Sequence, residues 1–183
     1  MEKSAFEIKV DSASPLFNKA DMEYEEFPSD FSRIRLYATW LIRSTPSGIW
    51  EVNLLEQQIS EIIKNAIKHG NKNNINKKIK IWYKFTAEMV HLIVEDEGDG
   101  FKDLEKWNEF NRKRLQYIYE QNFKDLGKYV SFRSADSDAY DGGNALFAAV
   151  EYWNGGFVFN EKRNAVAMKK FFDNKNSSIV DRF

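Results

Sequence analysis

The stretch that decides the fold runs from residue 61 to residue 70 and reads EIIKNAIKHG. It closes a helix predicted from about Trp50 to Lys68, in which apolar residues recur at helical spacing and form one buried stripe. That stripe consists of Leu55, Ile59, Ile62, Ile63 and Ala66. Glu61, Asn65 and Lys68 share a helix face beside the stripe, because they are spaced by four and then three residues.

Glu61 and Asn65 offer two kinds of chemistry from one helix face. The amide oxygen of Asn65 can coordinate a hard cation such as Mg²⁺, which prefers oxygen ligands. The carboxylate of Glu61 can orient or deprotonate a water molecule or a hydroxyl group. The same residues also suit a solvated helix face, so this stretch taken alone leaves both interpretations open.

A second stretch, residues 96–101, reads DEGDGF and follows directly on an apolar strand. Asp96, at the end of that strand, can accept a hydrogen bond from an exocyclic amine such as that of adenine. Gly98 and Gly100 allow positive φ angles and let the main chain approach a ligand closely. A glycine-rich turn leaving a strand is the competing structural interpretation, because Gly and Asp are common turn residues.

The remaining pattern predicts an α+β fold, a two-layer α/β sandwich in which helices cover one face of an antiparallel-rich mixed sheet. Alternation predicts a first strand at Phe6, Ile8 and Val10. Residues 11–29 give little signal and are expected to wrap the surface. Further helices are predicted at 31–43 and 144–153, a hairpin at 79–85 and 90–94 with its turn at 86–88, and a closing hairpin at 157–159 and 166–172.

Residues 1–172 are expected to form a single domain, and residues 173–183 a flexible tail. The segment between Phe101 and Asp141 is charged and aromatic, with helical character around 107–121. The 183 residues are enough to bury a sizeable core.

Composition excludes several classes of function. The chain has no cysteine, which rules out disulfides, thiolate metal sites and a cysteine nucleophile. Its net charge of −1 gives no general electrostatic argument for binding nucleic acid or an anionic membrane. No apolar run resembles a signal peptide or a membrane span. We therefore expect a cytoplasmic protein with neither nucleic acid nor membrane among its partners.

Together, the two stretches resemble the nucleotide-binding boxes of the histidine-kinase/gyrase/Hsp90-like (GHKL) ATPases. Residues 61–70 look like the N-box of that superfamily, and residues 96–100 match its Asp-x-Gly-x-Gly box. Within the superfamily, the Glu-x-x-x-Asn-Ala-x-x-His-Gly form is similar to bacterial anti-sigma-factor serine/threonine kinases. The resemblance covers roughly residues 31–172, with residues 101–141 unmatched.

This resemblance implies a Bergerat-type ATP-binding fold, with ATP and Mg²⁺ as cofactors. It implies that Glu61 is the catalytic base, that Asn65 is the Mg²⁺ ligand, and that Asp96 binds the adenine amino group. Residues 101–143 would then be the ATP lid. The other residues that we expect to line the nucleotide site are Lys68, Gly98, Gly100, Gly142, Gly143 and Asn144.

Two positions depart from the family pattern. Ala145 stands where the second glycine of the family's Gly-x-Gly-Leu lid box is expected. The final hairpin of the family usually offers Gly-Thr before its last strand, whereas this chain has Arg163, Asn164 and Ala165 there. That difference removes a hydroxyl group that typically supports the adenine-binding aspartate.

Three functions remain open at this point. The first is a serine/threonine kinase that phosphorylates a small antagonist protein and also binds a sigma factor or another regulator. The second is a nucleotide-binding switch that transfers phosphate poorly or not at all, which Ala145 and the missing Gly-Thr favour. The third is a detached catalytic domain of a two-component sensor kinase. The resemblance also implies a possible homodimer.

Overall fold

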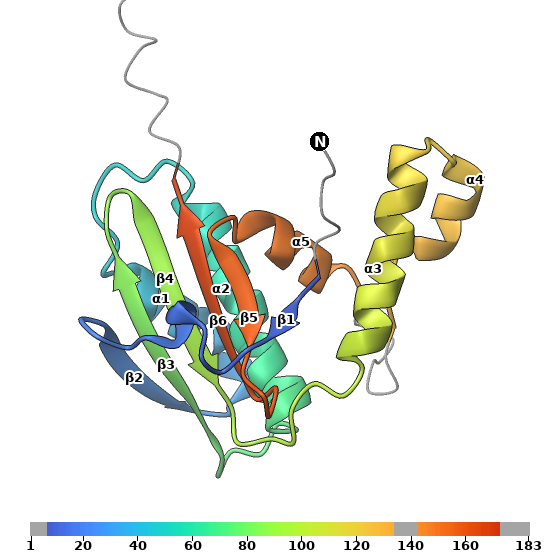
Figure 1. Ribbon diagram of the computed structural model, residues 1–183. Coiled ribbons are helices and arrows are strands. Elements are labelled where there is room, and N and C mark those ends of the chain that lie inside the picture. Colours follow the sequence, from blue (N-terminus) through green and yellow to red (C-terminus); the bar gives the residue numbers. More distant parts are fainter. Residues whose placement is uncertain (1–6, 134–142, 173–183) are drawn as a thin grey trace, which may run out of the picture.

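The computed structural model describes residues 7–133 and 143–172, and its centre is a six-stranded sheet with the order β1-β5-β6-β4-β3-β2 (Figure 1). Neighbouring strands pair antiparallel except β1 and β5, which are parallel. The predicted antiparallel-rich mixed sheet is confirmed. The strands are β1 (Lys9–Val10), β2 (Glu23–Pro28), β3 (Lys78–Phe85), β4 (Met89–Glu95), β5 (Gly156–Phe159) and β6 (Ala165–Phe171).

Three helices cover one face of this sheet and enclose the main core (Figure 1). They are α1 (Ile34–Ile42), α2 (Val52–Asn65) and α5 (Ala145–Tyr152). The predicted stripe of α2 is buried, and it packs against the inward-facing side chains of β3 and β4. On the opposite face, Ile93, Val158 and Ala167 are covered by the segment around the short helix η1 (Pro15–Phe17).

The start of α1 and the β3–β4 turn both follow from local side-chain hydrogen bonds. Asp30 caps the 3₁₀ turn η2 (Phe31–Arg33), since its carboxylate accepts from the Ser32 N–H at 3.0 Å. In the turn after β3, the Thr86 hydroxyl accepts from the main-chain N–H groups of Glu88 and Met89. Both elements lie where the sequence predicts them.

The strand β2 corrects the sequence analysis, which expected residues 11–29 only to wrap the surface. Residues Glu23–Pro28 pair antiparallel with β3 along its whole length and form one edge of the sheet. Most of its side chains are exposed and three are glutamates, so the usual alternation of apolar and polar residues is missing. An edge strand of this kind gives little periodic signal.

The first strand is shorter than predicted. Among the described residues only Lys9 and Val10 pair with β5, and Phe6 lies outside that part of the chain. Ile8 is buried in a second apolar cluster with Leu104, Trp107, Phe147 and Val150.

Residues 104–129 fold into a helical projection beside the sheet (Figure 1). It comprises α3 (Leu104–Tyr119), α4 (Phe123–Leu126) and the 3₁₀ turn η4 (Gly127–Tyr129). Its base is anchored twice: Trp107 is 1% exposed, and the Asn108 amide pairs with both the N–H and the C=O of Ile8, at 2.9 and 3.0 Å. Arg112 adds an ion pair with Glu7 at 2.6 Å.

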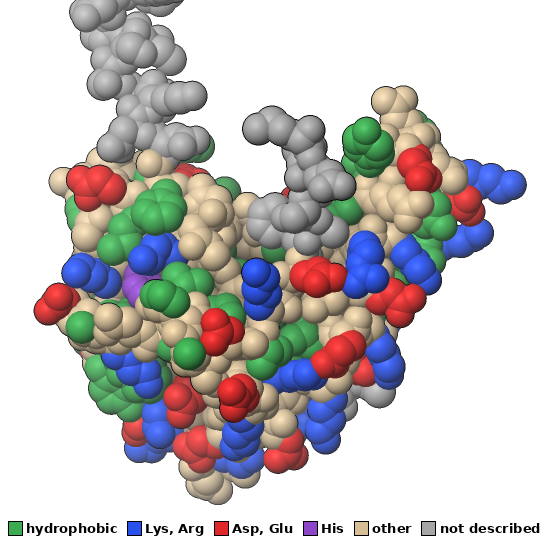
Figure 2. Space-filling model, in the orientation of Figure 1, with side chains coloured by type: hydrophobic (Ala, Val, Ile, Leu, Met, Phe, Trp, Pro, Cys, Tyr) green, Lys and Arg blue, Asp and Glu red, His purple; other side chains and the backbone are tan. Residues whose placement is uncertain are grey.

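The surface around this body mixes charges of both signs. Figure 2 shows acidic and basic side chains interspersed over the face in view. Among the described helices, none is long and apolar enough to cross a membrane.

Two adjacent leucines of α2 provide a matched test of the predicted core stripe. Leu55 is fully buried, whereas Leu54 is 42% exposed. We expect Leu55→Ala to lower the free energy of unfolding by about 2–5 kcal/mol, the usual loss for a buried leucine. Leu54→Ala should change it by less than about 1 kcal/mol. Urea denaturation of both variants measures this difference, and equal losses would contradict the assigned helix face.

Candidate functional site

A cavity of about 470 Å³ opens between the C-terminal part of α2, the end of β4, the start of β6, and the helices α3 and α5. It brings together the two sequence stretches that analysis singled out. The sequence-predicted residues on its wall are Glu61, Asn65, Asp96, Gly100, Gly143 and Asn144. Lys68 and Gly98 are not on the wall, and Gly142 lies outside the described residues.

The helix that carries Glu61 and Asn65 changes its winding at the cavity. α2 ends at Asn65 and continues as a π-helical turn from Ala66 to Gly70, in which the Asn71 N–H donates to the Ala66 carbonyl at 2.8 Å. Single π turns are rare in proteins as a whole, but those that occur often lie at functional sites. The turn brings the main chain of Gly70 against the loop that follows β4.

Asp96 is a partly buried acid on the cavity wall. Its Oδ1 accepts a hydrogen bond from the Gly98 N–H at 2.7 Å. Burial raises the pKa of this carboxyl to about 6, an effect that the hydrogen bond from Gly98 and the distant charges of Lys162 and Lys77 only partly offset. A ligand group that donates a hydrogen bond to this carboxyl would therefore be favoured at this position.

Glycine is required on both sides of Asp96. A Cβ atom at Gly70 would collide with the Asp96 carboxyl group, and one at Gly98 would collide with the Gly70 carbonyl. Gly100 has a φ of +85°, and a Cβ there would meet the Lys162 carbonyl. Gly98 thus contributes by supporting Asp96 rather than by lining the cavity.

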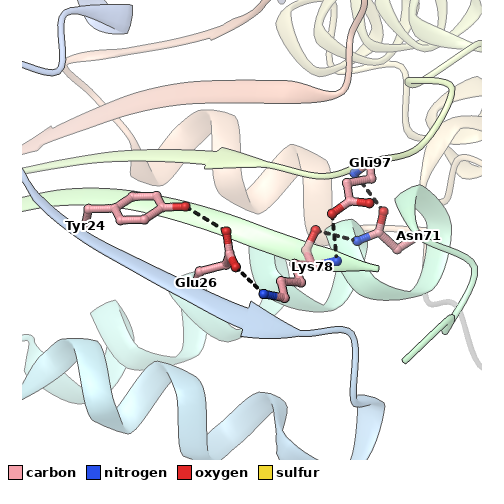
Figure 3. Close-up of polar contacts among 5 residues, drawn as sticks. All are labelled: Tyr24, Glu26, Asn71, Lys78 and Glu97. Carbon is pink, nitrogen blue, oxygen red and sulfur yellow. Dashed lines mark hydrogen bonds and ion pairs between the residues drawn. The ribbon is translucent and has the colours of Figure 1, made fainter. Parts of the chain in front are cut away.

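Asn71 joins three segments behind the cavity, and sequence analysis missed it (Figure 3). This fully buried amide donates to the Ser29 hydroxyl at 2.8 Å and to the Lys78 carbonyl at 2.9 Å. Its Oδ1 accepts from the Glu97 N–H at 2.7 Å. Asn71 therefore fixes the π turn, the start of β3 and the loop after β4 relative to one another. The sequence pointed to Asn71 only through its place directly after Gly70.

The contacts around Asn71 continue to the sheet edge. Figure 3 shows the Glu97 carboxylate accepting from the Lys78 N–H, at 3.1 Å. The Lys78 ammonium in turn bonds Glu26, which also accepts from the Tyr24 hydroxyl at 2.9 Å. These outer contacts are exposed, so they add little stability individually.

Asn164 occupies the position where the family pattern led us to expect a threonine. Its Nδ2 donates to the Asp96 carbonyl at 2.6 Å, and the Asp96 N–H donates to the Asn164 carbonyl at 2.8 Å. The Asn160 amide donates to the Asn164 Oδ1 at 3.0 Å. The main chain at Asp96 is thus supported by an amide on the cavity wall, although the expected hydroxyl group is missing.

Glu61 lies at the boundary of two hollows. It lines the cavity described above and also a more open groove of about 720 Å³ between η2, α1 and α2. Its carboxylate forms an ion pair with Lys64 at 3.2 Å, and both side chains are about one-third exposed. The groove gives Glu61 a route of approach that does not pass through the cavity.

The unmatched segment supplies one wall of the cavity. Phe101, Asp103, Trp107 and Phe132 all line it. The Trp107 ring stacks on Phe147 of α5 with centroids 5.1 Å apart. The described part of this segment, where the resemblance implies a lid, is folded and anchored at its base.

The mixed α+β architecture and the meeting of residues 61–70 and 96–100 on one cavity agree with the fold that the sequence resemblance implies. No family model matches the sequence. Curated relatives do match, and three examples follow. An anti-sigma F factor from Bacillus velezensis is 26% identical over 116 residues, or 59% of this chain and 80% of the relative. Serine-protein kinase RsbW from Bacillus subtilis is 26% identical over 141 residues, covering 73% and 78%.

RsbW from Staphylococcus aureus is 24% identical over 155 residues, covering 78% of this chain and 87% of the relative. The similarity therefore spans most of both chains. This protein is a distant homologue of the anti-sigma factors and RsbW serine kinases, GHKL-type anti-sigma-factor kinases.

Asp96 should make the ligand-free protein less stable as pH rises. Because the folded-state pKa is raised to about 6 from 3.8, folding favours the protonated carboxyl, and stability falls between about pH 4 and pH 6. We expect Asp96→Asn to abolish most of this slope and to raise the free energy of unfolding above pH 6 by up to about 3 kcal/mol. Urea denaturation at pH 4, 6 and 8 measures it; a variant less stable than the wild type at pH 8 would contradict the burial argument.

Proposed function

We propose that this protein is an ATP-dependent serine/threonine kinase that phosphorylates a small antagonist protein and binds a sigma factor or another regulator in a partner-switching system. The observation that carries the proposal is the shared cavity, whose wall holds an acid and an amide from α2 together with the partly buried Asp96. The names of the homologous anti-sigma factors and serine-protein kinases support the same reading.

In the proposed complex, the adenine amino group donates to Asp96, and the close approach of main chain at Gly98 and Gly100 leaves room for the base. Gly143 and Asn144 precede α5 and line the cavity. Main-chain N–H groups at the start of a helix favour anions, so this part of the wall suits the phosphates. The base and the phosphates would then lie between β4 and the start of α5.

Asn65 is the residue that would hold Mg²⁺. Within the described residues, no cluster of three or more His, Asp or Glu side chains could hold a metal by itself. Mg²⁺ fits this donor set nevertheless, since it commonly takes one or two protein oxygens and completes its shell with phosphates and water. When bound, the ion would neutralise charge on the transferring phosphoryl group.

Glu61 would act on the substrate hydroxyl. The side chain borders both the cavity and the outer groove, so a serine or threonine presented from the groove reaches it without displacing the nucleotide. The carboxylate would orient the hydroxyl and accept its proton as the oxygen attacks the γ-phosphorus. Lys64 must release the carboxylate or move with it, because the two are paired at 3.2 Å.

The ion pair with Lys64 and the presence of Ala145 favour a second candidate, a nucleotide-binding switch that changes partners without transferring phosphate. Both candidates require ATP in the same cavity. They differ only in whether Glu61 acts as a general base in phosphate transfer.

Glu61→Ala separates these candidates. Glu61 is expected to touch neither the adenine nor the metal, so ATP affinity measured by calorimetry should stay within a few-fold of the wild type. Transfer of labelled phosphate to a small antagonist protein should fall by about 10²–10⁴, the usual loss for a general base. Asn65→Ala should instead weaken both Mg-ATP binding and transfer.

Glu88→Ala, in the β3–β4 turn, serves as the matched control and should leave both measurements unchanged. Absence of transfer by the wild-type protein would leave the switch as the function. Loss of ATP binding in Glu61→Ala would show that Glu61 is structural rather than catalytic.

A further inference from the structure

The short strand β1 joins two walls of the cavity. Its main chain pairs with β5, where Val10 lies opposite Phe159, and the Asp11 N–H donates to the Phe159 carbonyl at 2.9 Å. Phe157 and Phe159 of β5 line the cavity. The residue before the strand, Ile8, is bonded to α3 instead. The strand therefore connects the β5 wall to the α3 wall.

Asn108 makes the contact between α3 and this strand. Its Oδ1 accepts from the Ile8 N–H at 2.9 Å, and its Nδ2 donates to the Ile8 carbonyl at 3.0 Å. The two bonds fix the orientation of the amide, because an N–H only donates and a carbonyl only accepts. The Ile8 side chain is buried in the apolar cluster that contains Leu104 and Trp107. Main chain and side chain of Ile8 thus both hold the base of α3.

Trp107 connects this contact to the cavity. It is the neighbour of Asn108 on the helix, its side chain is buried, and it lines the cavity. Its ring stacks on Phe147 of α5. Asp103, one turn earlier in the chain, lies on the same wall. Displacement of α3 from Ile8 would therefore move this wall away from a bound ligand.

Two ion pairs also hold α3, but each has exposed partners. Glu105 pairs with Arg163, and Glu7 pairs with Arg112 at 2.6 Å. The glutamate side chains are 69% and 48% exposed, and exposed ion pairs add little stability. The Asn108 bonds are part-buried. Of these three contacts, the loss of the Asn108 pair should displace α3 most.

We propose that Asn108 is a positioning residue for the nucleotide, which acts through Ile8 to hold Trp107 and the α3 wall against the bound ligand. The inference rests on the proposed ATP site and makes the N-terminal strand β1 a structural part of it. Asn108 is not on the cavity wall, so its effect on the nucleotide passes through its neighbours.

The test measures how fast mant-ATP, a fluorescent ATP analogue, leaves the protein in stopped-flow displacement by excess ATP. Asn108→Ala should release mant-ATP about tenfold faster than the wild type, the effect of about one net hydrogen bond. Its association rate should stay within about twofold, since changes at a binding site act mostly on dissociation. A purely structural role would lower the free energy of unfolding and leave the release rate unchanged, because only folded protein holds the analogue.

A second background shows whether the effect passes through Trp107. In Trp107→Phe, the added Asn108→Ala substitution should speed release by less than about threefold, since residues that act through one another are not additive. Two substitutions on the same helix serve as controls. Arg112→Ala removes the exposed ion pair, and Gln116→Ala changes an exposed side chain further along α3. Both should keep the wild-type release rate within about twofold.

Ile8→Val takes the place of Asn108→Ala if the latter does not fold. It removes one methyl group from the same cluster and should speed release about two- to threefold. A wild-type release rate in the variant that folds would overturn the inference, as would a tenfold effect of Asn108→Ala that persists in Trp107→Phe. In either case mant-ATP binds and the proposed site stands. Failure of the wild type to bind mant-ATP and ATP would overturn the proposed function and this inference with it.

Discussion

The close approach of Gly70 to Asp96 is the contact on which the site depends. The end of the α2 helix and the loop after β4 touch main chain to main chain, because neither Gly70 nor Gly98 carries a side chain. A larger residue at either position would separate the helix from the sheet at this point. The acid and amide of α2 could then no longer share a cavity with the partly buried carboxyl of Asp96.

Two asparagines hold this contact from opposite sides. Asn71 ties the π turn to the main chain of Glu97, and Asn164 ties the start of β6 to the main chain of Asp96. The raised pKa of Asp96 is a cost of this site, since burial disfavours the charged carboxylate and the charges of Lys162 and Lys77 offset that effect only in part.

The sequence predicted the layers well because the core obeys simple periodicities. The stripe of α2 and the alternation in β3 and β4 are set by burial on one face, and those elements lie where expected. Edge strand β2 and the amides of Asn71 and Asn164 were missed for different reasons. An edge strand has no buried alternation, and an amide that bonds a main chain far along the sequence leaves no local pattern.

The base of α3 shows a further limit. The helical character of this segment was recognised but its anchoring was not: Leu104 and Trp107 are buried, and Asn108 pairs with Ile8, which is too far away in the sequence to leave a local pattern. The cavity residues themselves were recognisable because their residue types and spacing resemble known nucleotide-binding boxes.

The edge strand β2 has a consequence for the protein in a crowded solution. Its unpaired main-chain side could template another strand, which is the usual route to edge-to-edge aggregation. Glu23, Glu25 and Glu26 crowd three negative charges along it, and Pro28 ends it without an N–H to offer. An antiparallel copy of the same strand would bring glutamate near glutamate, so like-charge repulsion protects this edge from self-association.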